Sequence, residues 1–234
     1  MYKDSIEFCD FSTDEVEAYS KSMPTIFKDN IDIDKTAILN WRIDEFTTQR
    51  RQLVVMGDAF FSAAYNLLNQ CLNDNHDKKA DAWIFPIMFN IVHGIEIYLK
   101  GIIMCISIVT GNEIKKPEGA HNIKQLSQTA KKYILKYKTT NKNDTTDQMW
   151  TAIKVVEKFI DNIYDKTSDM TFARYPMDKQ FVGHFYIQLK ENVSIDLELL
   201  HKQIIIVYKM LNFIFDVPEL EVELTEQMLS DLYY

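Results

Sequence analysis

An apolar stretch from residue 85 to residue 109 restricts the fold of this chain more than any other feature of its sequence. It opens with Phe85-Pro86, and proline suits the first turn of a helix, where its missing N–H needs no partner. The next breaker is Gly111, so the stretch predicts one helix of about seven turns. Because a helix that is apolar on nearly all sides is buried, we expect it to lie at the centre of the fold.

Three polar side chains interrupt this stretch: His93, Glu96 and Lys100. At about 100° per residue, they fall within an arc of roughly 60° on the helix. Glu96 and Lys100 stand four apart, in the order that favours a helical ion pair. Two interpretations stay open: the pair is a clamp between helices, or the three residues form the polar floor of a binding cleft. Gly94 and Gly101, two turns apart, are places where a neighbouring backbone can approach closely.

The overall composition favours helices. Only six Gly and five Pro occur in 234 residues, which disfavours a turn-rich all-β architecture. Hydrophobic residues make up 47%, enough for a packed core. The formal net charge of −8 excludes a basic nucleic-acid footprint over the whole molecule, but it is compatible with a local basic cleft.

The cysteines and the first residues predict a cytoplasmic protein. The three cysteines lack metal-type spacing, and Cys71 and Cys105 lie within apolar helical patterns that suit reduced core thiols. The N-terminal residues do not resemble a secretory signal. Residues 83–109 are long enough to span a membrane. Their three central polar residues would each cost about 2.5–3.5 kcal/mol there, so we expect a buried helix and no membrane contact.

Apolar periodicity and capping signals predict the remaining helices. A short one begins at the Ser12–Glu15 capping box and ends at Pro24. The others run from about residue 34 or 36 to 73, with Gly57 allowing a bend or a close crossing, from 120 to about 138, from 147 to 165, and from 194 or 196 to 215. Pro218 is expected to stop the last helix, which leaves an acidic tail.

Residues 166–193 break the helical pattern, and residues 172–193 predict a short extended or hairpin insertion in which residues 181–189 form a strand or a hairpin arm. We find no internal repeat and no domain boundary in the sequence. The expected fold is therefore all-α, an antiparallel helical bundle formed by one domain over residues 1–234. Residues 1–34 would be an N-terminal extension, and residues 217–234 the acidic tail.

The order of four segments resembles a HEPN domain, an α-helical family found in bacterial and archaeal defence and toxin proteins. The segments are His93-Gly-Ile-Glu-Ile-Tyr-Leu-Lys100, Gly119-Ala-His-Asn-Ile-Lys-Gln-Leu126, Phe172-Ala-Arg-Tyr-Pro176 and the final helix from Ile195. The resemblance covers roughly residues 83–216, and it implies a helical bundle.

The resemblance also implies a ligand. Many HEPN members are similar to metal-independent ribonucleases that carry a closely spaced arginine and histidine. This sequence lacks that spacing, because nine residues separate Arg174 from His184. Members without the motif bind RNA or nucleotides, or act as partner modules. The resemblance therefore implies a defence or toxin-type protein that binds RNA or a nucleotide in a cleft between helices, with metal-independent RNA cleavage as the enzymatic form of this function.

Cleavage of RNA without a metal needs a histidine as general acid or base, and a cation that stabilises the phosphorane. The candidate catalytic residues are Arg174, His121 and His184, and the candidate substrate-binding residues are Glu96, Lys100, His93 and Tyr175. We predict no metal and no cofactor. Each candidate also has a structural interpretation: His121 as a helix cap, Arg174 as the partner of Glu96, and His184 as a partly buried histidine with its hydrogen bonds made.

The alternative function is a non-catalytic interaction or scaffold module, such as a regulatory subunit or a dimerising partner. The acidic tail contains the apolar residues Leu224, Met228, Leu229 and Tyr233, which would suit a homodimer or a protein partner. The acidic residues Glu219, Glu221 and Glu223 are interpreted as solvated charge.

Overall fold

The computed structural model describes residues 12–23, 25–40, 42–43, 47–111, 121–167, 169–188 and 192–232. The chain divides into two compact units, Met1–Asp44 and Glu45–Tyr234, and each is described by itself. Within the described ranges every regular element is a helix, which confirms the all-α prediction. Pro24, residues 112–120 and Tyr233 lie outside them, as does the side chain of Leu229.

The first unit contains a short helix, α1 (Thr13–Lys21), and a 3-10 turn, η2 (Ile33–Lys35). The predicted capping box is present, because the Ser12 side chain accepts from the Glu15 N–H and the Glu15 side chain accepts from the Ser12 N–H. None of the described residues of this unit is buried. Residues 36–40 are not helical, and the next helix begins at Gln49. The long helix predicted from residue 34 or 36 is therefore wrong at its start.

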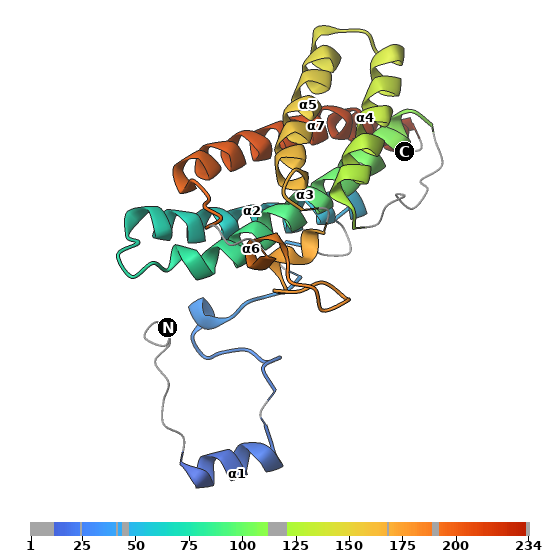
Figure 1. Cartoon of the computed structure of the whole chain (residues 1–234). Helices are drawn as coiled ribbons and strands as arrows, with labels where there is room; N and C mark the ends of the chain where they lie inside the picture. Colours follow the sequence, from blue (N-terminus) through green and yellow to red (C-terminus); the bar gives the residue numbers. More distant parts are fainter. Residues whose placement is uncertain are drawn as a thin grey trace. The chain divides into compact units, whose positions relative to one another are not determined.

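The second unit is a helical bundle around α3 (Ala80–Val109). Its other elements are α2 (Gln49–Asn73), α4 (Ile123–Thr140), α5 (Asp144–Tyr164), η3 (Met170–Ala173), α6 (Phe185–Gln188) and α7 (Leu197–Leu232). Figure 1 shows two hairpins, α2 with α3 and α4 with α5, and the long α7 across them. α3 packs against α2, α4, α7 and η3, so the most apolar helix is the central one, as predicted.

More than half of the residues of α3 are buried, which agrees with its apolar sequence. By length and composition α3 is also long and apolar enough to cross a membrane, a test that the core helix of a soluble protein passes as well. Inside this protein 78% of its most apolar window is buried. The absence of membrane contact and the cytoplasmic location remain predictions.

Two glycines set the distance between α2 and α3. A Cβ on Gly57 would lie 2.7 Å from the Tyr98 ring, and a Cβ on Gly94 would lie 2.9 Å from the Phe61 ring. Such distances are shorter than a carbon–carbon contact allows, so a larger residue would push the helices apart. The sequence predicted that helices approach closely at Gly57 and Gly94, and the packing of α2 against α3 confirms this.

The last helix does not stop at Pro218, contrary to the prediction. α7 continues through this proline to Leu232. The residues that follow the proline supply the reason, because Glu219 and Val222 are only 1% and 2% exposed and pack into the unit. Their burial offsets the backbone hydrogen bond that proline cannot donate. The expected acidic tail is therefore the last turns of α7.

The segment after η3 also differs from the prediction. Residues 181–189 were expected to form a strand, but within the described part of this segment a single antiparallel bridge joins Met177 to Gly183. The short helix α6 follows directly. The Asp178 carboxylate accepts from the N–H groups of Gln180 and Val182, and these bonds close the tight loop between the two bridge residues.

Candidate functional site

Glu96 lies at the centre of a polar cluster on α3, and its side chain is 9% exposed. Lys100 donates from Nζ to Oε1 of Glu96 at 2.6 Å, and Nδ1 of His121 lies 3.0 Å from the same oxygen. Nδ1 of His93 lies 3.8 Å from Oε2. Burial raises the pKa of Glu96, but the hydrogen bonds with Lys100 and His121 outweigh it, so the pKa lies below its ordinary value.

The predicted ion pair between Glu96 and Lys100 is therefore present. His121 does not cap α4, because the Asn122 side chain accepts from the N–H of Gln125 in that role. Instead, His121 connects the start of α4 to α3 through Glu96. Its side chain is 85% exposed, so this contact lies at the surface of the protein.

Arg174 lies directly after η3 and carries an exposed guanidinium group. Its Cζ is 5.9 Å from the centre of the Phe89 ring and 5.8 Å from that of Tyr175. Across the described residues it forms no ion pair, and its backbone N–H donates to Thr171. The interpretation of Arg174 as the partner of Glu96 is wrong, because Lys100 and His121 already take that carboxylate.

Phe89 connects Arg174 to the cluster around Glu96. Its ring stacks on His93, with 5.6 Å between ring centres and an interplanar angle of 8°. Phe60 meets the same imidazole edge-on at 4.4 Å. Tyr175 is 59% exposed. The structure thus gathers an arginine, a histidine and three aromatic rings next to the Glu96 carboxylate, and we call these residues, with Lys100 and His121, the Arg174 surface.

His184 does not belong to this surface, because it is 6% exposed. Its Nε2 lies 3.5 Å from the Thr171 hydroxyl, which donates to the Asp169 carboxylate at 2.6 Å. Burial raises the pKa of Asp169. The hydrogen bonds from Thr171 and the electrostatic effects of His184 and Arg174 outweigh burial, so the pKa lies below its ordinary value. His184 is thus a buried histidine with a polar neighbour. Neither it nor His121 forms a hydrogen bond with Arg174 within the described ranges.

A second polar network joins α2 to the end of α7, and our sequence reasoning missed it. The Arg50 guanidinium donates from Nε to Glu219 and from Nη2 to Glu226 at 2.9 Å. The Cys105 thiol donates to Glu219 at 3.2 Å. The interpretation of Glu219 as solvated charge is therefore wrong. The available signal was the spacing of Glu219, Glu223 and Glu226, which puts three carboxylates on one helical face.

A third network lies between α2, α3 and α7. The hydroxyls of Tyr98 and Tyr208 both donate to the Asp58 carboxylate, that of Tyr208 at 3.0 Å. The Asn212 amide lies 2.8 Å from the Tyr98 hydroxyl. Burial is the largest cause that raises the pKa of Tyr98, and the hydrogen bond with Asp58 raises it further. His201 is half-buried, and its ring centre lies 5.1 Å from that of Tyr65.

The described residues contain no group of three or more His, Cys, Asp or Glu side chains placed to hold a metal ion. No model of a known protein family matches the chain, and comparisons with curated proteins and with solved structures also find no match.

Proposed function

We propose that this chain is a HEPN-like protein of the bacterial defence or toxin type that binds RNA or a nucleotide at the Arg174 surface. The observation that supports this most directly is the position of Arg174, an exposed residue whose guanidinium lies over two aromatic rings and forms no ion pair among the described residues. Burial raises the pKa of nearby Asp169, and the charge of Arg174 is among the effects that lower it. A guanidinium in this state can bind a phosphate through two parallel hydrogen bonds.

The aromatic neighbours suit the other half of a nucleotide. Tyr175 is 59% exposed, so one face of its ring can receive a base. Stacking of a base on an aromatic ring contributes about 1–3 kcal/mol and tolerates any base. Arg174 and Tyr175 are adjacent in the chain, so a phosphate and its base can bind side by side.

The charge balance limits the number of phosphates. Lys100 and His121 are already hydrogen-bonded to Glu96, which leaves Arg174 as the main cation for the ligand. The formal net charge of −8 adds long-range repulsion. We therefore expect binding of a nucleotide or a short single-stranded RNA segment, with a salt dependence that corresponds to about one or two phosphate contacts.

Binding is better supported than cleavage. General acid–base catalysis needs a histidine within about 3 Å of the reacting group, or one bridging water. His184 is buried, and His121 is hydrogen-bonded to Glu96. Cleavage at Arg174 would therefore require His121 to leave Glu96 when RNA binds.

The test measures binding of fluorescein-labelled single-stranded RNA and of ATP to the full chain by fluorescence anisotropy and calorimetry. We expect Arg174→Ala to weaken binding by about ten-fold or more, as for a lost charge-assisted hydrogen bond. The matched control is Lys154→Ala, which removes another exposed cation that lies 5.1 Å from an aromatic ring, that of Trp150. If neither ligand binds at low salt, or if Arg174→Ala binds as wild type does, the proposal is wrong.

One observation favours the alternative function of an interaction module. Leu220, Leu224 and Met228 are 58%, 52% and 68% exposed, and their spacing of four puts them along one stripe of α7. Truncation after residue 217 would also remove Glu219, so point variants are the cleaner test. If the stripe mediates dimerisation, Leu224→Gln with Met228→Gln abolishes self-association in sedimentation velocity, and a monomeric wild type removes this candidate.

A further inference from the structure

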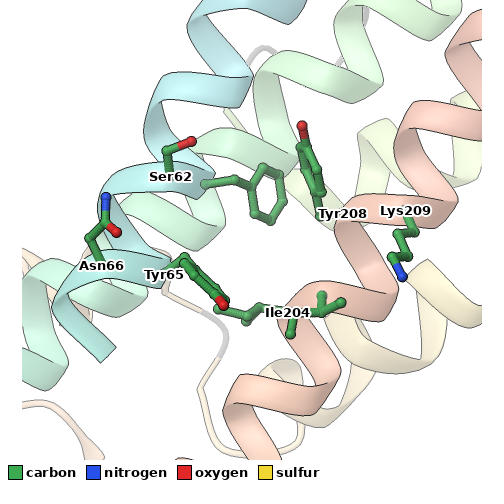
Figure 2. Close-up of a pocket in the computed structure, with 8 residues that line it drawn as sticks. Ser62, Tyr65, Asn66, Ile204, Tyr208 and Lys209 are labelled. Carbon is green, nitrogen blue, oxygen red and sulfur yellow. The ribbon is translucent and has the colours of Figure 1, made fainter. Parts of the chain in front are cut away.

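A pocket between α2 and α7 lies outside the Arg174 surface. It has a volume of about 400 Å³ and is lined by Phe61, Ser62, Tyr65, Asn66, Ile204, Ile205, Tyr208 and Lys209. Figure 2 shows Tyr65 of α2 reaching toward Ile204 of α7, with Tyr208 further along α7. A volume in this range is typical of small-molecule sites.

The walls of the pocket favour a flat apolar ligand. Three of the eight lining side chains are aromatic, and two more are isoleucines. Tyr65 is 40% exposed, so part of its ring is still open to contact with a ligand. Aromatic rings in such positions prefer to stack on, or meet edge-on, another ring.

The polar residues of the pocket set the charge of the ligand. Lys209 is the one cation among the lining residues, which include no carboxylate, and it forms no ion pair within the described part of the chain. The adjoining network contains the carboxylate of Asp58, which accepts hydrogen bonds from the Tyr98 and Tyr208 hydroxyls. Those two bonds compensate its charge locally.

One side of the pocket is held in a fixed position. The Tyr208 hydroxyl donates to Asp58 at 3.0 Å, and the Tyr208 ring centre lies 5.3 Å from that of Phe61. Phe61 itself is 4% exposed and packs against Gly94. A pocket with ordered walls loses little conformational entropy when a ligand binds.

We infer that this pocket binds a small planar aromatic molecule with one negative charge, with the ring against Tyr65 and Ile204 and the charge near Lys209. The volume admits one or two fused rings, but not a longer chain of nucleotides. Ser62 and Asn66 are exposed and lie four apart on α2, where they can hydrogen-bond to substituents at the rim.

The experiment uses naphthoate as the probe and naphthylmethanol as its neutral counterpart, with binding to the full chain followed by saturation-transfer NMR and calorimetry. We expect saturable binding of naphthoate that is lost in Ser62→Trp and in Asn66→Trp, which fill the pocket from exposed positions. Lys209→Met should weaken naphthoate binding roughly five-fold, as for an exposed ion pair, and leave naphthylmethanol binding unchanged.

Two controls keep this result separate from the Arg174 surface. Lys202→Met removes an exposed lysine two turns earlier on α7, and it should bind naphthoate as wild type does. Arg174→Ala should also leave naphthoate binding unchanged. No saturable binding, or equal binding by the Trp variants in a folded state with an unchanged Tm, would overturn the site. Equal effects of Lys209→Met and Lys202→Met would overturn the assignment of an anion.

Discussion

The buried pair of Arg50 and Glu219 gives the sharpest test of how the end of α7 is held. The Arg50 side chain is 7% exposed and that of Glu219 is 1% exposed. Removing one member of a buried ion pair costs about 3–5 kcal/mol, because the other charge stays desolvated. In Glu219→Ala, Arg50 keeps Glu226, whose side chain is 55% exposed. We therefore expect a loss near the lower end, about 3 kcal/mol.

The assay is urea unfolding of the full chain, followed by circular dichroism, with the free energy of unfolding compared at equal m-values. The matched control is Glu223→Ala, since its partner Arg51 is 43% exposed and such a pair contributes about 0.2–1 kcal/mol. Replacing both Arg50 and Glu219 with Met should recover most of the loss. A cost for Glu219→Ala below about 1 kcal/mol, or no larger than that of Glu223→Ala, would refute the reasoning.

Three further predictions concern α3 and its neighbours. Gly94→Ala should destabilise the protein by about 1–3 kcal/mol in urea unfolding, because the new methyl group overlaps the Phe61 ring, and wild-type stability would show that the helices adjust freely. Burial raises the pKa of Glu96, but its hydrogen bonds hold the pKa below 4.5, so its stabilisation is present above pH 4.5 and is lost as the pH falls through the folded pKa. Glu96→Gln should therefore lose less stability than wild type between neutral pH and about pH 3, and an equal acid dependence would contradict this. Tyr98→Phe should lower the free energy of unfolding by about 1–3 kcal/mol, since it removes the hydrogen bond from the Tyr98 hydroxyl to the partly buried Asp58. A loss smaller than the experimental error of urea unfolding would show that this hydrogen bond does not stabilise the protein.

The features that the sequence predicted correctly depend on neighbours along the chain. The central position of α3 follows from its apolar residues, and the Glu96–Lys100 pair follows from a spacing of four. The Ser12–Glu15 capping box is equally local. In each case the residues that decide the structure lie in one continuous stretch of chain, so no knowledge of the tertiary fold is needed.

One error arose where a distant residue decides the local structure, and the other where a local helical turn outweighs an alternating pattern. Pro218 ends a helix by its own chemistry, but Arg50 in α2 holds Glu219 in a buried ion pair directly after it. The residues around Pro218 contain no information about Arg50, which lies 169 residues before Glu219 in the chain. Residues 181–189 alternate in a way that suggests a strand, yet the Ile187 and Gln188 N–H groups donate to the carbonyl oxygen of His184, which forms a helical turn.

Of the two interpretations of the polar cluster on α3, the contacts of Glu96 support the clamp between helices. Glu96 is a clamp, because Lys100 and His121 together satisfy its carboxylate and join α4 to α3. This arrangement has a consequence for Arg174, since a buried carboxylate that is already hydrogen-bonded to Lys100 and His121 has little attraction left for another partner. The guanidinium contacts Phe89 and Tyr175 instead. If the clamp were loosened by Lys100→Met, Glu96 would attract Arg174 and compete with a phosphate ligand, so nucleotide binding should weaken although the surface cation itself is intact.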